Sequence, residues 1–169
     1  MLVLPILLLG NPLLREQSSP VEDFNQKELQ QTITNMEDTL AHLQKQEGLG
    51  RGLAAPQIGI PKQIIVFKTS GAPNVMINPK IRETSTDKFL VWDSCFCFKL
   101  AFFVEVERFQ KICVEYQDTK GVREVIDAED TLAELFQHEI DHLHGVLAID
   151  RMTSTQRICM REEWENQFQ

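Results

Sequence analysis

The chain has 169 residues, of which 43% are hydrophobic and 25% are charged, and this balance is typical of a globular protein rather than a disordered one. A net charge of −8 argues against a surface that binds nucleic acid or an anionic membrane. Four cysteines without a CxxC pair argue against a disulfide framework and favour reduced thiols in the cytoplasm. We expect residues 1–169 to form a single domain.

The chain begins with an apolar segment that is predicted to pack on the rest of the protein. Leu2 to Leu9 is too short to span a membrane and lacks the preceding basic residue of a signal peptide. Five apolar residues then recur at alternating intervals of four and three: Leu29, Ile33, Met36, Leu40 and Leu43. This spacing predicts an amphipathic helix from Val21 to about Gln46, which Gly48 ends.

A glycine-rich loop from Gly48 to Gly59 follows this helix. Its small residues would let the backbone approach another group closely. It does not fit a phosphate-binding loop, because no Gly-Lys-Ser/Thr follows it. Gln57 is its single side-chain amide, and such a glutamine is most often solvated, so the loop alone is weak evidence of a site.

Short strands are predicted through the middle of the chain, where apolar and β-branched runs lie between turn residues. They are Gln63 to Lys68, Val75 to Ile77, Lys88 to Trp92, Cys95 to Val106 (a strand or hairpin), Lys111 to Tyr116, and Val122 to Ile126. A turn at 71–74 is expected between the first two. Thr153 and Gln156 have the spacing of a capping box and predict that a last helix opens there.

The pentapeptide His138 to His142 (HEIDH) is the strongest functional signal. Residues four apart share one face of a helix, so His138 and His142 can bind one metal ion. Glu139 lies beside that face, where its carboxylate can accept a proton from a metal-bound water. A 3.6-residue apolar period predicts the helix from Ala128 to Leu143.

These elements predict an α+β fold with mostly antiparallel β-sheets packed around a central HExxH helix. An N-terminal and a C-terminal helix complete it.

The residues themselves leave the third metal ligand open. A histidine or aspartate six residues after the second histidine is excluded, because position 148 is alanine. Glu162 and Glu163 lie at the distance expected of a His₂Glu site. Cys95 would instead give a Cys-His₂ site with an open position for water.

Three motifs together resemble the peptide deformylase family in order and rough spacing. They are GRGLAAPQIG (Gly50 to Gly59), DSCFC (Asp93 to Cys97) and QHEIDHLHG (Gln137 to Gly145). The resemblance covers nearly the whole chain. It implies that the chain is an enzyme that removes the formyl group from the N-terminal formylmethionine of nascent polypeptides.

The resemblance also implies a metal centre formed by Cys95, His138 and His142. The ion expected in the cell is Fe²⁺, with Zn²⁺, Ni²⁺ or Co²⁺ in a purified sample. Glu139 would move the proton, and the Gln57 amide with the Phe96 backbone N–H would stabilise the oxyanion.

The same resemblance gives the expected partners. Substrate contacts are expected at Gly50, Arg51 and Gly52. The partner would be an N-formylated peptide, with transient association with the ribosome and no nucleic acid or membrane.

The middle motif departs from the Glu-Gly-Cys-Leu-Ser that is usual in the family. We expect Asp93, which replaces the glutamate, to face Arg108. Cys97 adds a second thiol close to Cys95, either as a packing residue or as a redox liability. Arg51 stands where an apolar residue is usual.

These departures leave two alternatives open. One is a deacylase that acts on another N-acyl or lysine-acyl group, and the other is a degenerate, non-catalytic homologue. A purely structural metal site would not need Glu139, which argues against the second alternative.

Overall fold

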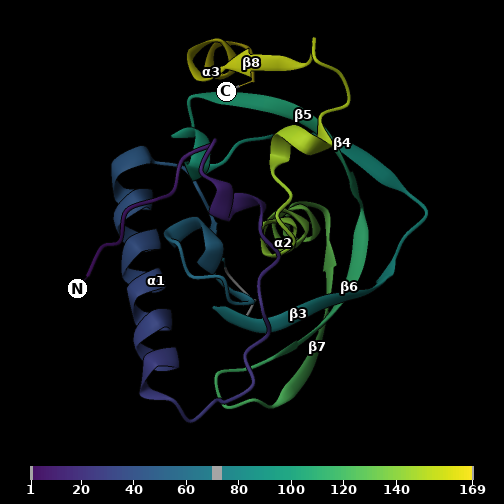
Figure 1. Cartoon of the computed structure of the whole chain (residues 1–169). Coiled ribbons are helices and arrows are strands. Elements are labelled where there is room, and N and C mark those ends of the chain that lie inside the picture. Colours follow the sequence, from purple (N-terminus) through teal and green to yellow (C-terminus); the bar gives the residue numbers. More distant parts are fainter. Residues whose placement is uncertain (1, 70–73, 169) are drawn as a thin grey trace.

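Two antiparallel β-sheets and a long helix surround one buried helix. The computed structural model describes residues 2–69 and 74–168, and α2 is seen end-on at the centre of Figure 1. Its three described α-helices are α1 (Lys27–Glu47), α2 (Asp130–Leu143) and α3 (Arg161–Phe168). The predicted α+β class, with N- and C-terminal helices and a central HExxH helix, is confirmed.

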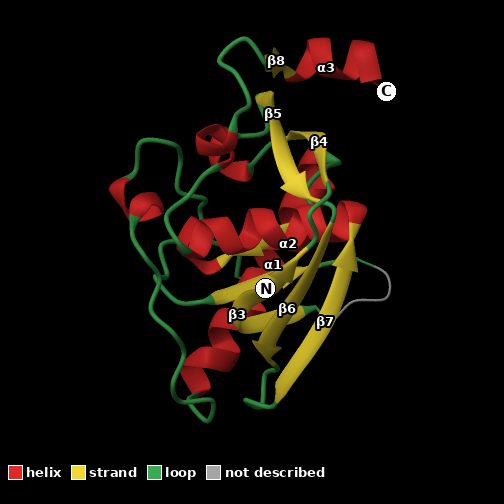
Figure 2. Cartoon of the chain, turned by 90° about the vertical axis from the view of Figure 1, so that its right-hand side faces the viewer, coloured by secondary structure: helices red, strands yellow, loops and turns green. Residues whose placement is uncertain are grey.

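The larger sheet lies on one side of α2, as Figure 2 shows. Its strand order is β1-β2-β3-β6-β7, and every pairing is antiparallel. The strands are β1 (Gly52–Ala54), β2 (Ile64–Phe67), β3 (Val75–Thr84), β6 (Lys111–Gln117) and β7 (Arg123–Glu129). Four of these strands match predicted ones, although β3 runs seven residues further than predicted, past a register shift after Ile77. Most of the turn expected at 71–74 lies outside the described residues.

The smaller sheet has the order β4-β5-β8, with β4 at Lys88–Asp93, β5 at Phe102–Phe109 and β8 at Ile158–Met160. The prediction of a strand or hairpin beginning at Cys95 is wrong for its first part. Residues Phe96–Phe98 form a 3-10 turn, and Lys99 ends it in the left-handed region (φ 54). The aromatic residues that suggested a strand are buried in this turn instead.

The predicted ends of three helices also need correction. Val21 is not helical, because its backbone binds the Asn78 side chain through two hydrogen bonds of 2.8 Å, and α1 begins only at Lys27. The metal-site helix starts at Asp130, where β7 ends. The capping box predicted at Thr153 is absent: this region leads into β8, and α3 follows at Arg161.

Helix α2 is held by both sheets, and most of its side chains from Ala133 to Leu143 are buried. Phe136 is fully buried and packs on Phe67 of β2, with ring centroids 4.9 Å apart. On the other face of the larger sheet, α1 buries its predicted apolar stripe against β1 and β2. Burial of this size fixes the orientation of α2, and thus of every side chain that it presents.

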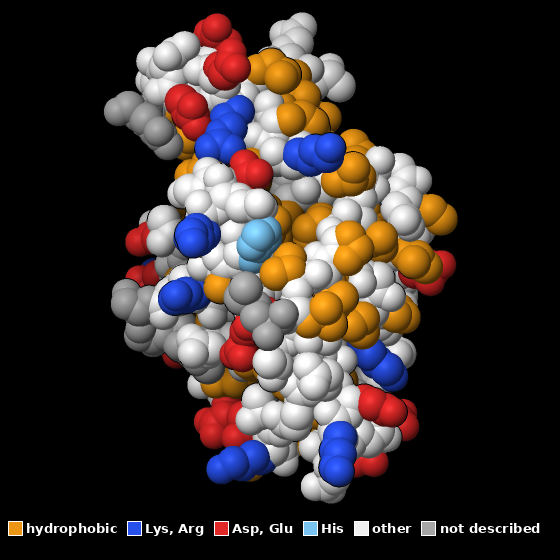
Figure 3. Space-filling view, turned by 90° about the vertical axis from the view of Figure 1, so that its left-hand side faces the viewer, with side chains coloured by type: hydrophobic (Ala, Val, Ile, Leu, Met, Phe, Trp, Pro, Cys, Tyr) orange, Lys and Arg blue, Asp and Glu red, His pale blue; other side chains and the backbone are white. Residues whose placement is uncertain are grey.

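The N-terminal segment packs on the body in an extended conformation, as predicted. The Leu7 N–H donates to the Gln57 carbonyl (2.8 Å), and the Leu9 N–H donates to the Cys97 carbonyl (3.0 Å). Three apolar residues of this segment, Leu2, Val3 and Leu8, are exposed. Figure 3 shows apolar side chains gathered on one face of the molecule. Among the described helices, none is long and apolar enough to cross a membrane.

Replacing Phe136 with alanine should lower the free energy of unfolding by about 3–5 kcal/mol, because a fully buried ring leaves a cavity. Urea unfolding followed by circular dichroism measures this change. The control is Val125→Thr at a strand position that is 63% exposed, where a change below about 0.5 kcal/mol is expected. A loss below about 1 kcal/mol for Phe136→Ala would contradict a core built on this ring.

Candidate metal centre

The two histidines of the HEIDH motif face one another on α2. Their Nε2 atoms lie 3.2 Å apart, and both side chains are buried. Two imidazole nitrogens at this distance, one turn apart on one helix face, form half of a tetrahedral metal site. His138 and His142 share one face of α2, as the sequence predicted, and their role as metal ligands stays a prediction.

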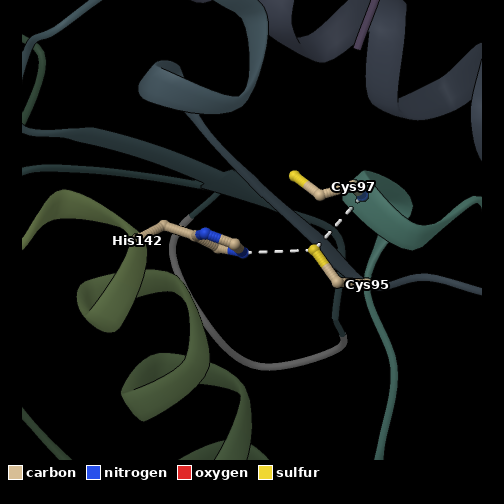
Figure 4. Close-up of side chains that lie close together, drawn as sticks. All are labelled: Cys95, Cys97 and His142. Atoms are coloured by element: carbon tan, nitrogen blue, oxygen red, sulfur yellow. Dashed lines mark hydrogen bonds between the residues drawn. The ribbon is translucent and has the colours of Figure 1, made fainter. Parts of the chain in front are cut away.

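The sulfur of Cys95 lies 3.2 Å from His142 Nε2. Figure 4 draws this contact as a dashed line. Cys95 ends the loop after β4 in an extended conformation and caps the 3-10 turn, so its side chain projects toward α2. Burial, with the neighbouring Cys97 thiol, raises the pKa of Cys95 well above its ordinary value. A bound cation would favour the thiolate form that metal ligation requires.

The spacing of these donor atoms fits a metal ion. Metal–nitrogen bonds of about 2.0–2.1 Å and a metal–sulfur bond of about 2.3 Å place tetrahedral ligands about 3.3–3.6 Å apart. The two contacts of 3.2 Å, between the Cys95 sulfur and His142 and between the two histidines, are close to these values. Glu162 and Glu163, the alternative third ligands, are exposed on α3. A ring nitrogen of His138 lies within 4.8 Å of carboxylate oxygens of Asp93 and Glu134.

His138 is oriented by Asp93. Its Nδ1 lies 2.9 Å from Asp93 Oδ2, so Nδ1 keeps its hydrogen and Nε2 is the nitrogen that a metal ion would bind in place of a proton. Burial alone would lower the pKa of His138, but the Asp93 carboxylate outweighs burial and raises it to about 9. Burial would likewise raise the pKa of Asp93, whereas His138 and Arg108 lower it to about 2.

Arg108 completes this network, and the expected contact with Asp93 is present. The guanidinium donates to Asp93 Oδ2 (3.1 Å) and to Asp141 Oδ2 (2.6 Å). Asp141 also accepts from Arg151 (2.7 Å). The shorter side chain of Asp93 therefore reaches both His138 and Arg108 in this fold.

Glu139 is buried beside the two histidines. Burial raises its pKa to about 7, with His138 opposing and Asp93 adding to the shift, so the carboxyl group can take up or release a proton near neutral pH. Its Oε2 atom has no hydrogen-bond partner among the described residues. The other oxygen, Oε1, lies so close to Gly52 that an added Cβ there would be 2.4 Å away.

The Gln57 amide has a fixed orientation. Its oxygen accepts a hydrogen bond from the Ala54 backbone N–H (2.7 Å), and its nitrogen therefore points at the sulfurs of Cys95 (3.2 Å) and Cys97 (3.5 Å). Phe96 is the first residue of the 3-10 turn, a position whose N–H has no acceptor within the turn. The Gln57 amide and the backbone N–H of the residue after Cys95 are thus two N–H donors near this candidate ligand.

A cavity of ≈ 240 Å³ opens next to these groups, with the candidate ligands Cys95 and His138 in its wall. Gly50, with φ +93, packs on the Phe96 ring so closely that a Cβ would lie 2.1 Å from it. Six further apolar residues line the cavity: Leu49, Val91, Trp92, Leu100, Phe103 and Leu135.

An ion pair in the cavity wall was not predicted from the sequence. Arg51 forms a salt bridge with the buried Glu134 and donates to the Thr131 carbonyl (2.8 Å). Two sequence signals point to this pair in hindsight. Arg51 is a charged residue at a usually apolar position, and Glu134 lies one helical turn before His138.

Comparison with known proteins gives one consistent family. The profile of the polypeptide deformylase family matches residues 3–158. A peptide deformylase of Thermotoga petrophila is 40% identical over 160 residues, which cover 94% of this chain and 92% of that protein. One of Heliobacterium modesticaldum is 40% identical over 153 residues, or 90% of this chain and 95% of that protein.

Solved structures agree with these relatives. The crystal structure of the Thermotoga maritima peptide deformylase superposes with a TM-score of 0.83 and 38% identity, covering 91% of this chain and all (100%) of that one. A Synechococcus elongatus peptide deformylase in complex with actinonin gives a TM-score of 0.83 and 36% identity, covering 96% of this chain and 85% of that one.

Replacing Asp93 with asparagine should weaken Zn²⁺ binding by about 10- to 100-fold, because the variant loses the charge that fixes the tautomer of His138. Competition with a chromogenic chelator measures the affinity. Glu107→Gln is the control, since it removes an exposed ion pair with Lys88 in the same sheet. Equal affinities of the Asp93→Asn variant and the parent chain would refute the orienting role of Asp93.

Proposed function

The chain belongs to the peptide deformylase family and is a metal-dependent hydrolase that removes the formyl group from nascent polypeptides; on this basis we propose a role for each residue of the site. Cys95, His138 and His142 hold the metal. The contacts of 3.2 Å that link the Cys95 sulfur, His142 and His138 carry this proposal.

We propose Fe²⁺ as the native ion, with Zn²⁺, Ni²⁺ or Co²⁺ as replacements in a purified sample. One thiolate and two imidazoles suit these ions, whereas Mg²⁺ and Ca²⁺ prefer oxygen ligands. When bound, such an ion lowers the pKa of a coordinated water and polarises a carbonyl group.

Glu139 is the proton-transfer group. A pKa of about 7 lets its carboxylate accept a proton from the attacking water and deliver it to the leaving amine. The unpaired Oε2 atom supports this role, since a buried carboxylate oxygen without a donor is costly unless it serves a ligand.

Gln57 and the Phe96 backbone N–H stabilise the developing oxyanion. The hydrogen bond from Ala54 holds the Gln57 amide with its nitrogen turned toward the metal ligand Cys95. Fixed donors of this kind need no reorganisation during the reaction, and loss of one typically lowers the rate by about 100-fold or more.

The formylated peptide would enter along the cavity beside the metal ligands. Gly50, Arg51 and Gly52 form one side of it, and the Arg51–Glu134 ion pair gives this wall a polar part. The expected partner is the N-formylated N-terminus of a nascent chain. Transient association with the ribosome in the cytoplasm follows from such a substrate.

Replacing Glu139 with glutamine should lower kcat on formyl-Met-Ala-Ser by about 100-fold or more, because an amide cannot accept the proton, while metal content stays unchanged. The assay uses anaerobically Fe²⁺-loaded protein. Glu163→Gln on the exposed face of α3 is the matched control.

Acetyl-Met-Ala-Ser tests the alternative substrate class. The parent chain should cleave the formyl peptide faster than the acetyl peptide. Faster cleavage of the acetyl peptide would overturn the deformylase assignment, and undiminished activity of Glu139→Gln would overturn the role of Glu139.

Replacing Gly52 with alanine should lower kcat/KM by about 100-fold, because the new methyl group displaces the Glu139 carboxylate. The effect should be much smaller in a Glu139→Asp background, where the carboxylate is already withdrawn. A double-mutant cycle on formyl peptide turnover measures this coupling. Strictly additive losses would show that Gly52 acts on something other than Glu139.

A further inference from the structure

We propose that Cys95 and Cys97 form a reversible disulfide when the protein meets a peroxide, and that this disulfide releases the metal. The release of the metal rests on the ligand role proposed above for Cys95, whereas formation of the disulfide does not. Nothing in the hydrolytic reaction uses the second thiol, although it is almost fully buried beside the first.

Several contacts bring the two sulfurs together. The Gln57 amide nitrogen lies 3.2 Å from one sulfur and 3.5 Å from the other. The Cys97 backbone N–H points at the Cys95 sulfur (3.4 Å), a contact drawn in Figure 4. The two sulfurs and a ring nitrogen of His142 lie within 4.8 Å of one another.

The backbone between them already suits a disulfide. The Cα separation across two peptide units depends on the conformation of the middle residue, and Phe96 is helical. A helical middle residue brings the flanking Cα atoms to about 5.5 Å, within the roughly 4.4–6.8 Å seen in disulfides. Side-chain rotation is then the main movement that brings sulfur to bonding distance.

Oxidation would begin at Cys95, because its side chain lines the open cavity and that of Cys97 does not. The Cys95 sulfur attacks hydrogen peroxide, the O–O bond breaks, one oxygen remains as a sulfenic acid and the other leaves as water. The Cys97 thiol then attacks the Cys95 sulfur, and the second oxygen leaves as water. In total, two thiols lose two hydrogen atoms and one peroxide becomes two waters.

The second thiol therefore changes the outcome of oxidation. A sulfenic acid without a neighbouring thiol reacts with a second peroxide molecule, which leaves as water, and becomes a sulfinic acid that most proteins cannot reverse. A disulfide keeps both sulfurs in an oxidation state from which a dithiol can reduce them back to thiols. While the disulfide stands, the metal lacks one of its three protein ligands.

Tryptic peptide mapping tests the disulfide directly. Cleavage after Lys88 and Lys99 yields one peptide that holds both cysteines and no other. After limiting hydrogen peroxide and alkylation without reduction, this peptide should carry no alkyl group and be lighter by two hydrogen atoms than its reduced form. The oxidised protein should also run as a monomer on a non-reducing gel, because the disulfide forms within one chain.

Cys97→Ser and Cys159→Ser separate this reaction from general thiol oxidation. The Cys159 variant should behave as the parent chain, since its half-buried thiol lies on β8, outside the cysteine pair. With hydrogen peroxide in excess, the Cys97 variant should accumulate sulfinic acid at position 95. Both proteins are then treated with dithiothreitol and Zn²⁺, and the Zn²⁺ bound is compared with that of the same protein before peroxide. The fraction recovered by the Cys97 variant should be at least about tenfold smaller than the fraction recovered by the parent chain.

Two outcomes would overturn the proposal. One is a peroxide-treated parent chain with sulfinic acid at Cys95 and a free thiol at Cys97. The other is equal recovery of metal binding by the parent chain and Cys97→Ser. A disulfide that forms without loss of bound Zn²⁺ would instead refute the ligand role of Cys95, so the two failures are distinguishable.

Discussion

The carboxylate of Asp93 is the group on which the geometry of the site depends. It ends β4 and binds His138 of α2 and Arg108 of β5, so a single buried charge joins the smaller sheet to the metal helix. A buried carboxylate is costly unless it is paired and hydrogen-bonded, and here two donors satisfy it. The same contact holds the hydrogen on His138 Nδ1 and turns Nε2 toward His142. Asp93 therefore fixes both the packing of α2 on the smaller sheet and the nitrogen that His138 offers to a metal.

Close packing imposes a second constraint around this network. Glycine is required at position 52 because Glu139 occupies the space of a side chain, and at position 50 because Phe96 does. The backbone of the glycine-rich loop is thereby pressed against the two residues proposed for proton transfer and oxyanion binding. A rigid loop at this distance leaves Glu139 poorly solvated, which is the cause of its raised pKa.

The sequence predicted those features that depend on local periodicity. The helical face shared by His138 and His142, the strands from β2 to β7 and the apolar stripe of α1 all follow from repeating patterns within one element. The turn at Phe96–Phe98 and strand β8 did not follow, because their buried aromatic and alternating residues fit several local structures. Long-range pairing with β5 decided the conformation of β8. The partner of Arg51 lies 83 residues away, so no pattern within one element could show that Arg51 pairs with Glu134.

The two hydrogen bonds of the N-terminal segment have a consequence for how the protein folds. Leu7 and Leu9 bind the carbonyls of Gln57 and Cys97, residues far along the chain. Closing such long loops loses chain entropy, so contacts of this kind form late unless a nucleus has already brought their partners together. The segment that holds Leu7 and Leu9 would thus be among the last parts of the fold to reach its native place, and the backbone around Gln57 and Cys97 would gain these two contacts only then.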